Sequence, residues 1–386
     1  MSTDPDLSPP SAPVGTTSTV PTPGPPPPAV PKKERVPLWD NARWLAITLV
    51  VVGHAILKLI GESDTAYATY LFIYAFHVPL FVAVSGYFAK SGPPDTRQLS
   101  RLLTDLVFPY VIFETIWTTV RWLLGGSFRL DYSSASWTLW FLLALVVWRI
   151  LLPYLVLLRY PLVVSVLLSL GAGYVDQIDS TFALSRTIGL LPFFVFGWKL
   201  RQLHLTGRWL SLTSGAVWRW RVAALALFGT VAVLCLVFTP QLRALQVRRF
   251  LLYDEAYASF GYDQFWAVGV RLGLMILAFG LVVAFLMLVP RVTTWFSPLG
   301  TATMYIYLLH SFVLYPLRES GVLDGPQPAW MLPALIVLSV LISAGLAQAP
   351  VRRLTRPLVE PRGRWLFRTE AATLTGTIVL PARDLK

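Results

Sequence analysis

An arginine and a histidine stand eleven positions apart in the first long apolar stretch of the chain, at Arg43 and His54. Eleven residues make just over three turns of an α-helix, so both side chains project from nearly the same face, about 16 Å apart along the axis. An ionisable side chain inside a membrane helix is costly and commonly functional. We interpret Arg43 as a cation at the membrane surface and His54 as a proton acceptor within the membrane, a layout that suits a long anionic donor. Arg43 could instead be an interface anchor whose charge reaches water.

The second apolar stretch carries a second histidine, His77, followed by Pro79 and a Ser-Gly pair, Ser85 and Gly86. Proline breaks the backbone hydrogen-bond ladder and can open carbonyl groups toward a cavity. We therefore expect His77 to be functional. Ser85 could contact substrate, or it could be a small residue at a helix interface.

Glu114, His310 and Trp140 are candidates for supporting roles. Glu114, in the third apolar stretch, could bind substrate hydroxyls or hold a cation from a neighbouring helix. His310 is a further intramembrane histidine, which could be functional or could make a structural hydrogen bond to another helix. Trp137 and Trp140 begin the fourth stretch, where tryptophans usually form an interface belt.

The elements that position these residues are membrane helices. Hydrophobic residues make up 55% of the 386 residues and charged residues only 13%, with a mean hydropathy of +0.61. Because backbone groups in lipid must be satisfied within the segment, we expect an all-α, polytopic helical bundle. Ten spans are predicted at residues 44–60, 67–88, 103–124, 137–152, 155–172, 188–200, 222–238, 268–289, 303–317 and 330–347.

Arginine and lysine residues gather on one set of the loops between these spans, and acidic residues gather on the other. This bias predicts that both termini lie in the cytoplasm. Residues 1–37 are expected to form a disordered Pro-rich tail, residues 38–350 the membrane domain, and residues 351–386 a basic tail. The longest outside loop, residues 240–266, could close over a polar substrate or could be a plain connector.

Several function classes are excluded by what the sequence lacks. It has no phosphate-binding loop, no His-Glu-x-x-His, no Cys-x-x-Cys and no Gly-x-Ser-x-Gly. This argues against an ATP-driven transporter, a zinc protease and a standard serine hydrolase, and we expect no metal site. The net charge of +12 comes largely from arginines that flank apolar spans, so nucleic-acid binding is not expected.

Five short motifs stand in order along the chain: Asp40-x-x-Arg43 with His54, Phe76–Tyr87, Arg97 and Arg101 before Pro109-Tyr110, Leu139–Leu142, and Tyr307–His310. Together they resemble the acyltransferase-3 family of integral membrane O-acyltransferases, and they are most similar to its fucose 4-O-acetylase-like branch. One departure is the spacing of Arg97 and Arg101, which is one residue longer than the Arg-x-x-Arg of many members.

The resemblance implies an O-acetyltransferase of the bacterial cytoplasmic membrane, with no bound cofactor. It would move an acyl group, expected to be acetyl, from cytoplasmic acyl-CoA to a hydroxyl of a carbohydrate or lipid-linked acceptor of the cell envelope. His54 and Arg43 would be catalytic, and Arg43, Arg97 and Arg101 would bind the donor. Contacts to substrate, or support, would come from Asp40, His77, Ser85, Glu114, Trp140 and His310.

Two questions stay open at this point. His54 could accept the hydroxyl proton, or it could carry the acyl group briefly as an acyl-imidazole. The rival class is a proton-coupled transporter that uses the histidines as relays, which would favour paired inverted repeats with interrupted helices. A non-catalytic scaffold is a third reading, in which His54 could be replaced without consequence.

Overall fold

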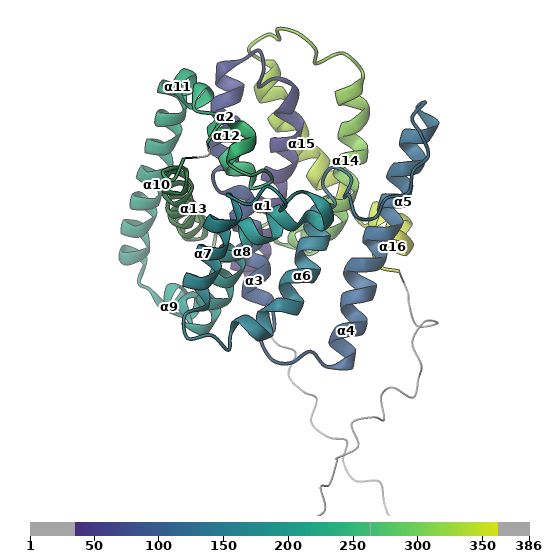
Figure 1. Ribbon diagram of the computed structural model, residues 1–386. Coiled ribbons are helices and arrows are strands. Elements are labelled where there is room, and N and C mark those ends of the chain that lie inside the picture. The colour runs from purple at the N-terminus through teal and green to yellow at the C-terminus, as the bar shows by residue number, and fades with distance from the viewer. Residues whose placement is uncertain (1–34, 263, 362–386) are drawn as a thin grey trace, which may run out of the picture. The chain divides into compact units, whose positions relative to one another are not determined.

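The computed structural model describes residues 35–262 and 264–361, and within these ranges the chain is helical and has no β-strand (Figure 1). This confirms the all-α fold class. The first α-helices are α1 Pro37–Ala55, α2 Asp64–Tyr74, α3 His77–Phe88, α4 Thr96–Leu102, α5 Phe108–Leu123, α6 Trp140–Leu155, α7 Pro161–Ala172 and α8 Leu184–Gln202. They are followed by α9 Leu205–Ser211, α10 Ser214–Val237, α11 Thr239–Ala244, α12 Val247–Leu252, α13 Ala267–Leu288, α14 Thr303–Glu319, α15 Met331–Leu346 and α16 Ala349–Val359. Short turns of 3₁₀- or π-helix are η1 Ile56–Lys58, η2 Leu103–Val107, η3 Thr181–Ala183, η4 Ala258–Phe260 and η5 Ser297–Ala302.

Fewer helices are long enough to cross a membrane than the ten spans predicted from the sequence. Among the described residues, five helical segments are long and apolar enough to cross a membrane: Pro37–Lys58, Asp64–Phe88, Thr181–Gln202, Ser214–Val237 and Ala267–Leu288. A sixth is counted if α15 and α16, which meet at 73°, form one bent span. Each of the ten predicted segments does fall on a helix. However, α5, α6, α7, α14 and α15 have only 12 to 17 residues, and 16 residues reach about 24 Å across a core of about 30 Å. The count of ten is therefore not confirmed.

The second span is broken in the middle, and the break sets the position of a histidine. α2 ends at Tyr74, Phe76 leaves the helical region with φ −143°, and α3 begins at His77. Pro79 is the third residue of α3. The N–H groups of the first turn of a helix have no partner within the helix, so proline loses no hydrogen bond at this position. The break therefore comes from Pro79 and puts His77 at the start of a helix, deep in the bundle.

Glycines hold α3 and α8 together at unusually short range. A Cβ atom on Gly86 would collide with the backbone carbonyl of Phe194, and one on Gly197 would collide with the backbone carbonyl of Ala83. The two backbones thus touch at two points, as small residues allow in membrane helix pairs. This contact fixes α8, and with it Arg186, relative to α3 and His77.

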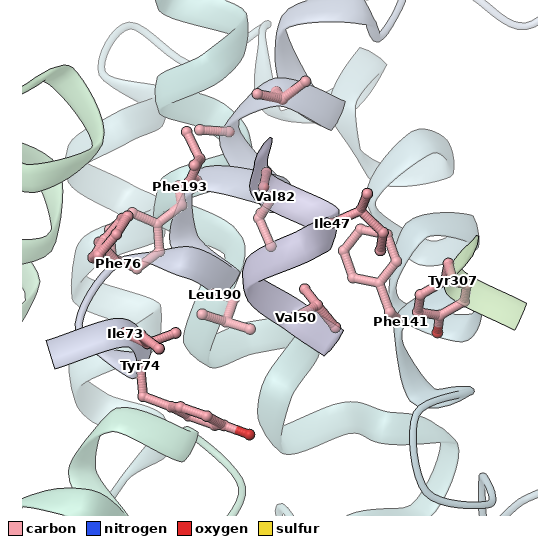
Figure 2. Close-up of a cluster of buried hydrophobic side chains, with 14 of the residues drawn as sticks. Ile47, Val50, Ile73, Tyr74, Phe76, Val82, Phe141, Leu190, Phe193 and Tyr307 are labelled. Carbon is pink, nitrogen blue, oxygen red and sulfur yellow. The ribbon is translucent and has the colours of Figure 1, made fainter. Parts of the chain in front are cut away.

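The N-terminal end of α1 is anchored by the buried side chain of Asn41. Its amide nitrogen donates to the carbonyl oxygens of Pro290 and Val292, both at 3.0 Å, and its amide oxygen accepts from Thr294 and Ser297. Asn41 therefore ties α1 to the segment between α13 and η5. The centre of α1 packs in a cluster of buried hydrophobic side chains that includes Ile47, Val50, Phe141 and Tyr307 (Figure 2).

The two ends of the chain fall partly outside the described residues. The predicted Pro-rich tail, residues 1–37, lies there apart from its last three residues, and α1 begins at Pro37. The predicted basic tail, residues 351–386, starts inside α16, and residues 362–386 are not described.

Candidate active site

A cavity of about 240 Å³ lies where α1, α2, α3, α6, α8, α12 and α14 come together. His54 and His77 both line it. Its remaining walls are mostly aromatic and aliphatic, with two arginines and one aspartate on the side of α12; the lining residues are Val50, Leu57, Tyr70, Tyr74, Val78, Phe81, Trp137, Thr138, Trp140, Phe141, Arg186, Arg248, Leu251, Leu252, Asp254 and Tyr307. An apolar cavity with a few converging polar groups is the usual form of a small-molecule site.

His54 is paired with the fully buried His310 on α14. His54 Nδ1 lies 3.0 Å from His310 Nε2, and the two rings are nearly parallel. His310 Nδ1 lies 3.0 Å from the carbonyl oxygen of Ile306 and 2.7 Å from that of Tyr307.

This chain of contacts determines which nitrogen of His54 is available for chemistry. A carbonyl oxygen only accepts, so His310 Nδ1 must carry a hydrogen, and in a neutral ring His310 Nε2 must then accept. His54 Nδ1 is therefore the donor, and the lone pair of neutral His54 is on Nε2. A histidine held in this tautomer can take a proton, or attack a carbonyl carbon, through Nε2.

His77 is oriented by its own helix break. Its Nδ1 lies 2.9 Å from the carbonyl oxygen of Ile73, one turn earlier, so Nδ1 donates and Nε2 keeps a lone pair. The ring of Tyr74 meets His77 edge to face at 4.4 Å between centroids. Tyr74 also lies against Gly53, where a Cβ would approach its ring to 2.9 Å. Gly53 therefore makes room for Tyr74 directly beside His54.

The loop before α6 brings a tryptophan against His54. Trp137 has φ +41°, which is rare and strained for a bulky residue. Its ring centroid lies 5.6 Å from that of His54, and the guanidinium of Arg318 lies 4.4 Å above the Trp137 ring. The backbone strain is thus stored at a residue that forms the cavity wall.

Glu114 holds this loop in place. Its side chain is 1% exposed, and it accepts from the backbone N–H of Ser136 at 2.7 Å and from the Ser136 hydroxyl. The cation near it, Arg121 at 3.4 Å, stands on the same helix, α5, and not on a neighbouring one. Glu114 therefore acts on the cavity only through Ser136, the residue before Trp137. On the other side, the Tyr307 hydroxyl donates to the carbonyl oxygen of Thr138.

The polar side of the cavity is formed by residues of α8, of α12 and of the segment after α12. Arg186 donates to Asp254 at 2.6 Å, and its guanidinium lies 5.0 Å from the ring of Trp140. Arg248 lies beside Tyr70, with Nε 3.5 Å from the hydroxyl oxygen. Of the two readings of the loop at residues 240–266, the structure favours closure over the cavity, because Arg248, Leu251, Leu252 and Asp254 line it.

A buried arginine fastens this loop to the bundle. Arg271 of α13 is 3% exposed, and its guanidinium lies 4.6 Å from the ring of Tyr253 and 5.3 Å from that of Tyr257. The Tyr257 hydroxyl donates to the carbonyl oxygen of Leu170. Burial raises the pKa of Tyr253 to about 12, although the charge of Arg271 opposes this shift. Tyr253 is therefore a neutral phenol near pH 7.

Arg43 lies outside this cavity. It pairs with Asp40 at 3.3 Å, its guanidinium lies 4.1 Å above the ring of Phe88, and its side chain is 31% exposed. Along α1 the cavity reaches only Val50, and Phe81 and Phe141, whose ring centroids lie 5.1 Å apart, line it with Val50.

The remaining predicted residues also lie outside the cavity. Arg97 and Arg101 are exposed on α4, and the Ser85 hydroxyl donates to the Phe81 carbonyl oxygen within α3 at 2.9 Å.

The structure thus assembles some of the predicted residues and adds others. His54, His77 and Trp140 line one cavity, and His310 and Glu114 support its walls. The sequence motifs did not point to four further cavity residues, which are Trp137, Arg186, Arg248 and Asp254. The only signal for the last two was the mixture of arginine, tyrosine and acidic residues at 240–266.

One known protein family matches most of the chain. The family described as an acyltransferase domain, of the acyltransferase-3 type, matches residues 37–348. The chain belongs to the acyltransferase-3 family. Its match covers the cavity and every helix that contributes to it. This confirms the resemblance seen in the sequence motifs.

One curated relative is similar over part of its length. The nodulation protein NolL of Mesorhizobium japonicum is 24% identical over 236 residues, which make up 57% of this chain and 61% of NolL. The chain therefore spans about three fifths of that relative. No solved structure matches the chain significantly.

Proposed function

We propose that this family member is an integral membrane O-acyltransferase. It moves an acyl group, acetyl in the simplest case, from acyl-CoA to a hydroxyl of a carbohydrate or lipid-linked acceptor of the cell envelope. The observation that carries the proposal is the His54–His310 pair, which leaves His54 Nε2 as the basic atom at the wall of the cavity.

In the direct mechanism, His54 Nε2 takes the proton of the acceptor hydroxyl as its oxygen attacks the thioester carbon of acyl-CoA. The new C–O bond forms, the C–S bond breaks, and the proton passes to the sulfur of CoA. His310 accepts the Nδ1 hydrogen of His54 throughout and so keeps the ring in one orientation. In the covalent alternative, the same lone pair attacks the thioester carbon first, the C–S bond breaks and CoA leaves as a thiolate. The acceptor hydroxyl then attacks the resulting acyl-imidazole, the C–N bond breaks and the hydroxyl proton passes to the CoA thiolate. Incubation with radiolabelled acetyl-CoA but no acceptor separates the two, because only the covalent route labels the protein.

The donor would bind from the Arg43 end of α1. Its phosphates suit a guanidinium, which donates in a planar fork, and its extended arm would run toward His54 over about 16 Å. The arm must pass Val50, Phe81 and Phe141, so these side chains would turn aside when the donor enters. Arg97 and Arg101, exposed on α4, would then attract the anionic donor from solution and would not grip it.

The direct test is transfer of labelled acetyl from acetyl-CoA to membrane glycans by vesicles that contain the protein. We expect wild-type vesicles to form the labelled ester and His54→Ala vesicles to form none. A proton-coupled transporter would move its substrate without ester formation. If wild-type vesicles with the protein correctly inserted never form the ester from any acyl-CoA, the proposal is wrong.

The proposal includes a bacterial cytoplasmic membrane location with both termini inside. In sealed inside-out vesicles, acetyl-CoA added outside should support transfer to enclosed glycan, whereas in right-side-out vesicles it should not. Ser11→Cys and Thr375→Cys on a Cys235→Ala background test the termini. Labelling of either cysteine by an impermeant reagent on intact cells would contradict this topology.

A further inference from the structure

One arginine of the cavity has no carboxylate partner within the described part of the chain. Arg248 is half-buried and lines the cavity. Its Nε lies 3.5 Å from the Tyr70 hydroxyl, at the long limit of a hydrogen bond, and its guanidinium lies 5.6 Å from the Tyr70 ring centroid. A guanidinium carries five N–H donors, so most of those of Arg248 remain available.

The arginines around Arg248 are different. Arg243, five residues earlier, pairs with Asp64 at 3.0 Å, and Arg249, the next residue, pairs with Glu255 at 3.4 Å. Within the cavity, Arg186 pairs with Asp254 at 2.6 Å. Among the described residues, the lining therefore has two guanidinium groups and one carboxylate, which leaves one positive charge at Arg248.

An uncompensated charge that is partly withdrawn from water is costly unless a counter-charge binds beside it. Arginine is also the residue best suited to grip a carboxylate or a phosphate, through two parallel hydrogen bonds. The cavity thus has a preformed place for an anion at its α12 side.

A row of aromatic rings in contact runs from Arg248 to the histidines. Tyr70 stacks on Tyr74 at 3.8 Å between centroids, and Tyr74 meets His77 at 4.4 Å and lies against Gly53, beside His54. An anion at Arg248 and a hydroxyl at His54 therefore contact the same wall, and one small molecule could reach both. Arg43, where the donor phosphates are proposed to bind, lies beyond Phe81 and Phe141, so the anion at Arg248 is not that of the donor.

We propose that Arg248 forms an anion subsite and that the acceptor is an acidic carbohydrate, with a carboxylate or phosphate on the same molecule as the acylated hydroxyl. This inference rests on the proposed function, because only an acyltransferase has an acceptor. Binding of an anion at Arg248 can nevertheless be tested without measuring transfer.

The test compares three small probes on the full chain in detergent: methyl glucuronide, which carries a carboxylate, glucose 6-phosphate, and the neutral methyl glucoside. We expect wild-type protein to bind at least one anionic probe about tenfold more tightly than the glucoside. Arg248→Gln should remove this preference. Arg249→Gln is the matched control, because Arg249 is adjacent, is paired with Glu255 and does not line the cavity, and it should retain the preference. The carboxylate and phosphate arms show which anion the subsite takes.

Equal binding of all three probes by wild type overturns the inference, as does a preference that survives Arg248→Gln. The comparison of the three probes on wild-type protein needs no variant. It can therefore overturn the inference even if the Arg248→Gln protein folds poorly. Arg248→Lys gives a second check, since it keeps the charge but not the fork and should bind the anion at intermediate strength.

Acetyl transfer to membrane glycans, measured in parallel, keeps the two claims separate. Anion preference without ester formation refutes the proposed function and leaves the subsite standing. Ester formation without anion preference refutes the subsite alone.

Discussion

The two ends of α1 present a cation and an imidazole on one helical face, yet their surroundings are opposite. Arg43 is about one third exposed, paired with Asp40 and stacked over Phe88. His54 lines the cavity, hydrogen-bonded to the buried His310 and packed against Trp137. The Arg43 end can hold a charged group that arrives from water, whereas the His54 end has mostly aromatic and aliphatic neighbours. Helical phase shows that two residues are aligned, but only their neighbours show that their environments differ.

The largest effect is expected for His54→Ala, which tests whether the His54 end of α1 carries the chemistry. We expect acyl transfer to fall about 10³-fold or more, because a general base contributes roughly 10²- to 10⁴-fold. Vesicle transfer assays at matched protein levels measure this effect. Activity close to wild type in a well-inserted variant would show that the buried end of α1 is not the chemical one.

A second change separates orientation from proton transfer. His310→Ala should lower kcat by roughly 10- to 100-fold, because His54 loses the acceptor that selects its tautomer. His310→Gln offers an amide oxygen to His54 Nδ1 and should recover part of the rate. If the Ala and Gln variants have equal activity, His310 fills space and does not orient His54.

A third change addresses the exposed end of α1. Arg43→Lys should raise the KM for acyl-CoA about tenfold with little change in kcat, because the charge stays and the planar fork is lost. Initial rates across donor concentrations give the two constants. A fall in kcat at an unchanged KM would place Arg43 in the chemical step. The assignment of donor binding to the Arg43 end and of chemistry to the His54 end would then be wrong.

The smallest expected effect is at Glu114, which reaches the cavity only through Ser136. Glu114→Gln should cost about 1–3 kcal/mol of stability, since the Ser136 donors lose a charged acceptor, and it should lower kcat several-fold through Trp137. Thermal melting and transfer rates are the measurements. Arg121→Gln is the control, because that half-exposed partner should change stability by less than about 1 kcal/mol. An equal loss in both variants would mean that the ion pair, and not the bond to Ser136, carries the effect.

The fold class and much of the site could be predicted from the sequence, since apolar length indicates membrane helices and the family motifs contain His54, His77 and His310. The part that could not be predicted depends on contacts between distant segments. Trp137 has the composition of an interface belt residue, and its place beside His54 follows from a bond between Glu114 and Ser136, 22 residues apart. Arg248 enters the cavity because Arg271 holds the adjoining segment through Tyr253 and Tyr257. The count of ten spans is not confirmed, because apolar composition does not report where a helix ends.

The glycine contacts between α3 and α8 have a kinetic consequence. Where Gly86 and Gly197 bring two backbones together, no layer of side chains remains in which the helices could slide past each other. The two helices would move as one rigid unit. Phe81, one of the two rings between the Arg43 end and the cavity, belongs to this unit. Donor entry would then proceed by rotation of individual side chains and not by collective displacement of helices. Such rotations belong to a faster class of motion than the rocking of whole domains, so opening of this path need not limit turnover.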